Sequence, residues 1–330
     1  MWPQKQIISK MSNIRSTTCS NDEQSDEEND KYLYEPMSKL LSIVFSGSLT
    51  RLTQHLKKHI GTINVRQIQP PNLTLFHACV RLKELKILKH LVDFDKEILL
   101  DSCIPTECGR TPIHSACEND DCNMIKYLLT LNNVVQSINA TDNEGIAPIL
   151  IAAKHGNIQI IKHLCGKKNK EGEWNYNLKD RALVHIPWDR SGQTPMLVAV
   201  AAGNLNLIKL LVKVDRVQNV EKMNLITSSS SKSIANGSII CANSRDGWTP
   251  FLLACVGNHL NIIRWLYNNG GNRDIDKPNK QGVTPMKYSV AAGTSHEKIV
   301  RQLQRYGVPL VDSTTARLGF FKKFKKGKEL

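Results

Sequence analysis

A short apolar phrase recurs five times along the chain, and each copy is followed by a second apolar segment. The copies are TPIHSAC from Thr111, APILIAA from Ala147, TPMLVAV from Thr194, TPFLLAC from Thr249 and TPMKYSV from Thr284. In the second segments, such as IIKHL and LIKLLV, apolar residues stand at i, i+3 and i+4, which is helical spacing. Two short helices repeated at a thirty-odd-residue period predict a stack of helical repeats that share one continuous core.

Single positions within the repeat indicate how each unit is built. Thr takes the N-cap of the first helix, and Pro follows at the first helical position, where its missing N–H costs nothing. A small residue comes five positions later, which lets the first helices approach one another closely: Ala78, Ala116, Ala152, Ala199, Ala254 and Ser289. Gly or Asn nine positions after the Thr suits a left-handed helix end, and Gly two positions before it suits the connecting turn.

The phrase TPIHSA, from Thr111 to Ala116, resembles the T-P-L-H-x-A phrase of the ankyrin repeat. The resemblance covers residues 38–310 and implies an all-α solenoid of stacked helix–turn–helix units with β-hairpin-like connecting turns. About seven repeats are expected, with starts near residues 38, 73, 111, 147, 194, 249 and 284. The first two copies lack the Thr-Pro pair, and Ile43 in the small-residue position of the first fits a terminal capping repeat.

Two of the steps between repeats are long, and they predict insertions at about residues 167–191 and 215–243. The first insertion mixes Trp174, Tyr176 and Trp188 with Lys and Arg. Packing on the neighbouring repeat, a protein contact and stacking on nucleic-acid bases are its three interpretations, with packing favoured. The second insertion contains the Ser-rich stretch Asn224–Ser238, which is expected to be a loop.

The two ends of the chain differ from the repeats and from each other. Residues 1–37 are acidic and are expected to be disordered, and Ser25, which precedes Asp26, is a candidate phosphorylation site. Residues 311–330 form a basic tail in which phenylalanines stand among Lys322, Lys323, Lys325 and Lys326. The tail has three interpretations: a cap over the last repeat, a nuclear-localisation signal, or a contact with an anionic membrane surface.

The chain carries 44 Lys and Arg against 30 Asp and Glu, a formal net charge of +14. A basic array predicts an acidic partner, which is an acidic protein segment, an anionic membrane surface or nucleic acid, whereas lysines on exposed helix faces also serve solubility alone. The sequence has no apolar run of the roughly 18 residues that a membrane span needs, and its start lacks the apolar region of a signal peptide. We therefore expect a cytoplasmic or nuclear protein that is neither secreted nor membrane-spanning, with its nine cysteines reduced.

Common catalytic motifs are absent from the sequence, including G-x-G-x-x-G, the P-loop, H-E-x-x-H and G-x-S-x-G. A cluster of Cys and His lacks zinc-site spacing: Cys103, Cys108, His114, Cys117 and Cys122. The resemblance instead assigns His114 to hydrogen bonds with turn backbone between repeats. We expect no enzyme activity, no cofactor and no metal site.

The resemblance implies a monomeric, non-catalytic adaptor or scaffold that binds an acidic or extended segment of another protein on its concave face. The corresponding positions are Arg110, Glu118, Asn119, Ile146, Lys154, His155, Gln193, Trp248 and Val283. Trp248 is the strongest candidate, because it directly precedes a helix-capping Thr. Nucleic acid is the least expected partner.

Two alternatives stay open. One is a nuclear regulator resembling the inhibitor-of-NF-kappa-B proteins, although SNDEQSDEEND lacks their DSGxxS-type degradation signal and the array is basic. The other is a peripheral membrane adaptor that uses the basic and aromatic tail.

Overall fold

The computed structural model describes residues 39–59, 74–96, 98, 105–131, 137–168, 172, 174–175, 181–184, 189–226 and 244–311. The chain divides into two compact units, Met1–Asn64 and Val65–Leu330. In the first unit, residues 39–45 are helical and α3 covers Leu49–Lys58. Gly47 lies between the two helices with a φ of 65°, as its position in the repeat predicts.

The second unit is a series of helix pairs, and it confirms the predicted stack of helix–turn–helix repeats. The pairs are α4 (Leu75–Arg81) and α5 (Leu85–Phe94), α6 (Pro112–Glu118) and α7 (Cys122–Leu128), α9 (Pro148–His155) and α10 (Ile158–Cys165), α11 (Pro195–Ala201) and α12 (Leu205–Ile226), α13 (Pro250–Val256) and α14 (Leu260–Asn268), and α15 (Pro285–Ala291) and α16 (Glu297–Arg305). A short 3-10 helix at Gly271–Asp274 follows α14, and another at Gly293–His296 lies between α15 and α16.

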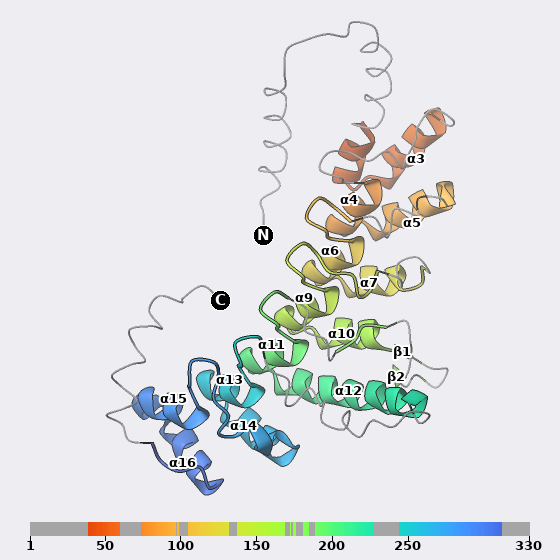
Figure 1. Ribbon diagram of the computed structural model, residues 1–330. Coiled ribbons are helices and arrows are strands. Elements are labelled where there is room, and N and C mark those ends of the chain that lie inside the picture. The colour runs from red at the N-terminus through yellow and green to blue at the C-terminus, as the bar shows by residue number, and fades with distance from the viewer. Residues whose placement is uncertain are drawn as a thin grey trace, which may run out of the picture. The chain divides into compact units, whose positions relative to one another are not determined.

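The helices form two layers. Each first helix packs on the next along the chain, in the order α4, α6, α9, α11, α13, α15. Figure 1 shows these first helices along the inner side of a curved array, with the second helices of the pairs along the outer side. The first-helix face is therefore the concave face.

The predicted capping positions explain where the first helices begin. Thr194, Thr249 and Thr284 are N-caps whose side chains accept hydrogen bonds from the third residue of the helix, and a Pro follows each of them. The small residues then stand where these helices meet: Ala116, Ala152, Ala199, Ala254 and Ser289 are all 0% exposed. A larger side chain there would push adjacent helices apart, so the position limits the spacing of the stack.

The second repeat differs from the prediction by one residue. Thr74 is the N-cap of α4, and its hydroxyl lies 2.9 Å from His77 Nδ1, as Thr111 lies 2.9 Å from His114 Nδ1. The Thr position is therefore residue 74 instead of 73, and Cys79 takes the small position that we assigned to Ala78. The missing Pro concealed this alignment in the sequence.

The ends of the first helices follow the predicted left-handed geometry, including two repeats that have neither Gly nor Asn at this position. Gly156, Gly203 and Asn258 have φ values of 70°, 73° and 58°. Lys83 and Asp120 occupy the same position with φ values of 62° and 57°. Repeat geometry therefore imposes the left-handed conformation even on residues that favour it little.

The two predicted insertions contact each other. The backbone of residues 181–184, in the first insertion, forms hydrogen bonds with the side-chain amides of Asn139 and of Gln218, which belongs to the second insertion. After a two-stranded antiparallel pair, β1 (Lys167–Lys168) and β2 (Trp174–Asn175), residues 181–184 are held from both sides. Asn139 bonds to the carbonyl of Arg181 and the N–H of Leu183, both at 3.1 Å. Gln218 bonds to the carbonyl of Ala182 at 2.9 Å and the N–H of Val184 at 3.3 Å.

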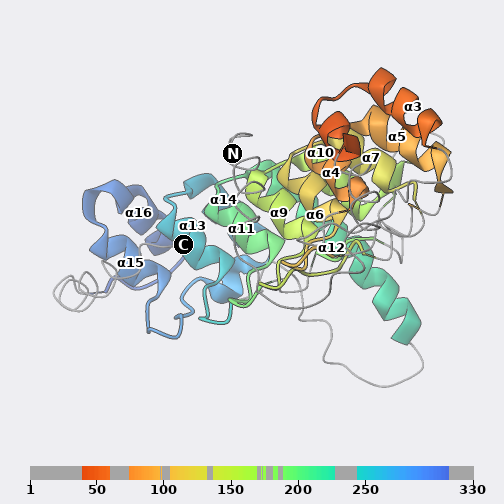
Figure 2. The ribbon, with the colours of Figure 1, turned by 90° about the horizontal axis from the view of Figure 1, so that it is seen from above.

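Gln218 lies on α12, so this helix continues into the second predicted insertion, and it ends at Ile226, just inside the Ser-rich stretch predicted to be a loop. Figures 1 and 2 show α12 extending well past the ends of its neighbours. Asp215 and Gln218 are 2% and 7% exposed, which shows that this extension packs on the array at least to Gln218. Tyr176 and Trp188, like the Trp174 side chain, lie outside the described residues, so the prediction for them stays open.

Candidate functional site

Five connecting turns join the repeats and share one hydrogen-bond pattern: residues 106–110, 142–146, 189–193, 244–248 and 279–283. In each, a side-chain oxygen of the first residue accepts the backbone N–H of the fifth, at distances from 2.7 to 3.2 Å. The fourth residue is always a Gly with positive φ. The fifth residue directly precedes the N-cap of a first helix, so the turn fixes the position of its backbone. The residues at this position are Arg110, Ile146, Gln193, Trp248 and Val283.

Neighbouring turns are also joined by backbone hydrogen bonds. Asn143 N–H donates to Cys108 O at 3.0 Å, Arg245 N–H to Ser191 O at 2.9 Å, and Lys280 N–H to Asp246 O at 3.0 Å. These are β-type contacts between successive turns, which confirms the predicted β-hairpin-like connections. Between the second and third turns the link is a side chain, since the Arg190 guanidinium donates to Asn143 O at 2.8 Å. With this link the five turns form a continuous edge of the array.

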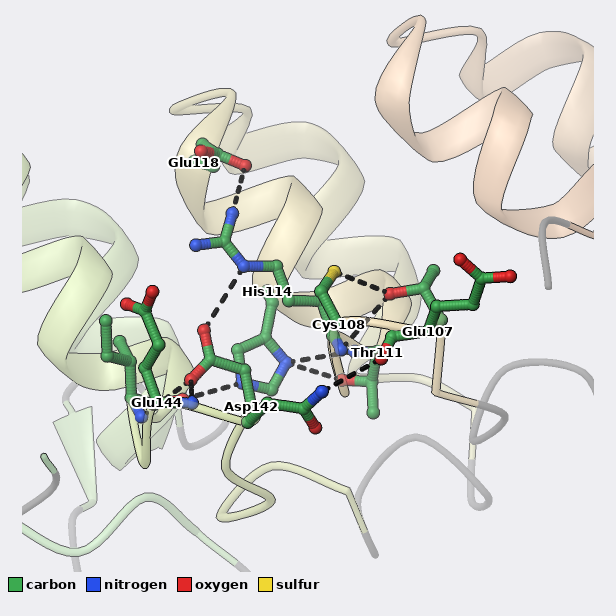
Figure 3. Close-up of polar contacts among 11 residues, drawn as sticks. Glu107, Cys108, Thr111, His114, Glu118, Asp142 and Glu144 are labelled. Carbon is green, nitrogen blue, oxygen red and sulfur yellow. Dashed lines mark hydrogen bonds and ion pairs between the residues drawn. The ribbon is translucent and has the colours of Figure 1, made fainter. Parts of the chain in front are cut away.

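His114 connects the third and fourth repeats at this edge (Figure 3). Its Nδ1 lies 3.1 Å from the backbone nitrogen of Thr111 and accepts that N–H, so the ring proton is on Nε2. Nε2 lies 3.0 Å from the carbonyl oxygen of Ile146, to which it donates. This confirms the role that the resemblance assigned to His114, a hydrogen bond to turn backbone of the next repeat.

Arg110 forms a small ion cluster with Asp142 and Glu118, which Figure 3 labels. Its Nε is 3.2 Å from Asp142 Oδ2, and its guanidinium is 3.0 Å from Glu118 Oε2. Asp142 is almost fully buried and also caps its own turn. Arg110 and Glu118 thus satisfy each other within the chain, which makes them poorer candidates for a partner's charges than the sequence suggested.

Two predicted partner-binding residues have structural roles instead. Val283 is 5% exposed, so its side chain offers almost no surface to a partner. Asn119 donates from its amide to the carbonyl oxygens of Val80 at 3.0 Å and Arg81 at 2.9 Å, which ties α6 to the preceding repeat. We therefore remove both from the candidate surface.

The remaining candidates lie at the surface. Lys154 and His155 are exposed at the end of α9, and Ile146, Gln193 and Trp248 are half-buried at turn ends. Ser25 and the tail lysines, Lys322, Lys323, Lys325 and Lys326, lie outside the described residues. Their predicted roles stay predictions.

One row of partly exposed side chains on the first helices was not predicted from the sequence. Val198, Leu253 and Tyr288 each stand four residues after the Thr position and are half-buried. Their equivalents in the third and fourth repeats, Ser115 and Ile151, are only 8% and 7% exposed. The repeat register alone would have placed these residues in one row, but their partial exposure depends on packing between neighbouring helices.

Three overlapping stretches of the chain, residues 75–180, 131–224 and 223–312, match the family model described as "Ankyrin repeats (3 copies)". The chain belongs to the ankyrin-repeat family. Among solved structures, the ankyrin-repeat domain of Bcl-3, described as a unique member of the IkappaB protein family, aligns with a TM-score of 0.55 and 18% identity. The alignment covers 81% of this chain and 97% of that domain, and at this identity it shows a shared fold. No curated protein matches the chain.

Ankyrin-repeat domains are generally non-catalytic protein-interaction modules. Burial raises the pKa of the Cys117 and Cys165 thiols, which keeps them protonated and poorly nucleophilic. Within the described ranges, no three His, Cys, Asp or Glu side chains are grouped so that they could hold a metal ion. Nor does any described helix have both the length and the apolar character needed to cross a bilayer.

The environment of His114 makes the stability of the ankyrin array depend on pH. Burial lowers the pKa of His114 from its usual 6.5, and this effect exceeds the opposing one of the Ile146 carbonyl. The unfolded chain therefore binds the proton more readily, so stability is fully present above about pH 6.5 and falls as the pH drops towards the folded-state pKa. We expect His114 to contribute a loss of up to about 1.4 kcal/mol per pH unit over that window.

The test compares urea unfolding at pH 7 and pH 5 for the wild type and His114→Leu. Leu occupies the same position in later repeats as Leu150, Leu197 and Leu252, so the variant has precedents within the chain. Its stability should fall less on acidification than that of the wild type. His155→Gln, which removes an exposed histidine, is the control. Equal acid sensitivity of the wild type and His114→Leu would contradict the assignment.

Proposed function

We propose that this ankyrin array is a non-catalytic scaffold that binds an extended segment of another protein across the concave face of its last three repeats. The observation that carries the proposal is the row of half-buried apolar side chains Val198, Leu253 and Tyr288. They stand at one repeat position on α11, α13 and α15, and these helices pack side by side. A partly exposed apolar row beside polar turns suits the apolar core of a protein interface.

Trp248 is the proposed anchor of this surface. It is half-buried at the end of the turn before α13, and its backbone N–H donates to Ser244 Oγ at 3.1 Å. The turn fixes the backbone of Trp248, so binding would cost little conformational entropy there. Trp and Tyr are also enriched among the residues that dominate interface energies. A partner's apolar side chain would pack between Trp248 and the row that includes Leu253.

The test removes the indole and measures affinity for a partner identified by proximity labelling of the full chain. We expect Trp248→Ala to weaken binding by about 2 kcal/mol, roughly 30-fold, because the anchor's buried area is lost. Calorimetric titration gives the affinity directly. Trp265→Ala is the matched control, since Trp265 is also half-buried but lies on the second helix α14.

The two variants must differ for the proposal to stand. An affinity that is unchanged in Trp248→Ala, or reduced equally in both variants, would rule out Trp248 as the anchor. If the partner bound Trp248→Ala with full affinity but bound Leu253→Ser weakly, the concave face would remain the proposed binding surface. The anchor would then be the row of half-buried side chains that includes Leu253, instead of Trp248.

The alternatives from the sequence depend on the two ends of the chain. Both the nuclear regulator and the membrane adaptor rely on residues 1–37 or 311–330, whose roles stay predictions. The similarity to the Bcl-3 domain is one of fold and does not favour either. An acidic partner was inferred from net charge alone. That charge lies mainly on the second helices, and therefore on a surface other than the concave face.

A further inference from the structure

The positive charge of the array lies mainly on its second helices. Together, α5, α7, α10, α12, α14 and α16 contain twelve Lys and Arg against four Asp and Glu, a net charge of +8. The corresponding first helices contain three against one, a net charge of +2. The side of the array opposite the concave face is therefore the more basic.

The charge on this side is periodic. The fifth residue of every one of these second helices is basic: Lys89, Lys126, Lys162, Lys209, Arg264 and Arg301. Lys162 is half-buried, and the other five are exposed. Equivalent positions on successive helices of a stacked array fall in one row, so these side chains form a basic row on the layer of second helices. Figure 1 shows these helices along the outer side of the array.

Contacts between repeats hold parts of the basic row in place. Lys89 Nζ lies over the ring of Tyr127 in the next repeat, 5.3 Å from its centroid. Arg264 Nε is 3.3 Å from Gln302 Oε1, again in the next repeat. Tyr127 and Gln302 are neutral, so Lys89 and Arg264 keep their positive charge uncompensated in these contacts. Within the described part of the chain, Arg301 is the one residue of the row with an acidic partner, Glu297.

A second row runs beside the first. The second residue of each helix, three positions earlier and thus on the same helical surface, is an exposed amide or Lys: Lys86, Asn123, Gln159, Asn206, Asn261 and Lys298. Neither row contains an acidic residue. The face offers cations and neutral hydrogen-bonding groups side by side along six repeats.

We propose that this second-helix face binds the phosphate backbone of a nucleic acid, independently of the concave face. The first helices pack on one another along the stack, and packed helices are about 8–10 Å apart, so six successive repeats spread the six cations over at least about 40–50 Å. At 3.4 Å per base pair, that length corresponds to at least about 12–15 base pairs. Lys and Arg with Asn and Gln are the side chains that commonly contact phosphate and sugar, and they carry no base specificity when they do so.

The same face fits a lipid bilayer less well. Among the described residues of the second helices, Phe94 is the one exposed large apolar side chain, at 42%. A surface that enters a bilayer needs an apolar stripe, and the row of amides stands where that stripe would be. From the sequence, nucleic acid was one of three acidic partners that the net charge suggests, and it was the least expected partner overall. The basic row becomes apparent only when the second helices are aligned.

The experiment measures binding of the full chain to a fluorescein-labelled 20-base-pair duplex by anisotropy over a range of salt concentrations. Six phosphate contacts predict a slope of about −5 in a plot of log K against log salt, and the basic tail would add to it. The variant K126Q/K162Q/K209Q should reduce the slope by about 3 and weaken binding about tenfold or more near 0.1 M salt. The matched control K154Q/K280Q/K287Q removes the same charge from exposed positions off this face and should change the slope by less than about 1.

Each outcome decides the proposal. A large effect of the outer triple with a small effect of the control, at equal melting temperatures, supports it. Equal effects of the two triples would show that net charge alone attracts the duplex and would overturn it. Tighter binding of a 14-residue polyglutamate peptide, or of vesicles rich in phosphatidylserine, than of the duplex would assign the face to an acidic protein or a membrane and would also overturn it.

Discussion

Replacing Phe251 with Ala should destabilise the array by about 3–5 kcal/mol, the largest loss that we expect from a single side chain. Phe251 is the second residue of α13, is 1% exposed and is among the largest fully buried side chains. Since α13 packs on α11, α14 and α15, the cavity would weaken contacts within the sixth repeat and with both neighbours. Stability in a repeat array depends on such nearest-neighbour contacts.

The measurement is urea unfolding followed by circular dichroism, with Phe251→Met as the control. Met fills the same position in the adjacent repeats as Met196 and Met286, both 0% exposed. The shape of the site therefore accommodates a thioether, and we expect the control to cost less than about 1.5 kcal/mol. If Phe251→Ala were no worse than Phe251→Met, the contacts around α13 would not be limiting for stability.

The repeat itself could be predicted from the sequence because each of its positions has a local physical cause. A capping Thr, a Pro at the first helical position and a buried Ala such as Ala199 act within one unit, so each copy shows the same pattern. The register failed at Thr74, where the Pro is missing and the neighbouring Leu73 offers no signal. The left-handed Lys83 was equally hidden, because the stack imposes its conformation.

The candidate surfaces were harder to predict because exposure depends on neighbours that are distant in sequence. Val283 and Asn119 occupy positions that face the solvent in a generic repeat, yet here one is buried and the other bonds to Val80 and Arg81. The clamp of residues 181–184 by Asn139 and Gln218 joins two insertions that the sequence shows only as long steps. The charge rows were visible in the sequence, but they gained meaning only once the second helices were aligned.

A methyl group added at Gly109 should cost about 2–3 kcal/mol, clearly more than the same change at the equivalent Gly282. Both glycines occupy the fourth position of a connecting turn, with φ values of 78° and 75°. An Ala pays about 1–2 kcal/mol for this left-handed conformation at either site, partly offset by the lower entropy of its unfolded chain. The two sites differ in what the new Cβ would meet.

At Gly109 that Cβ would lie 2.8 Å from the backbone nitrogen of Asn143, whereas nothing lies within 4 Å at Gly282. Asn143 N–H donates to Cys108 O, so the clash would disturb the bond that joins the turn at residues 106–110 to the turn at residues 142–146, which is worth about 0.5–1.5 kcal/mol. Urea unfolding of Gly109→Ala and Gly282→Ala isolates this term, because the backbone strain is common to both. Equal losses would show that the contacts between turns add nothing to stability; a larger loss at Gly109 would show that the continuous edge beside the concave face helps to hold the repeats in register.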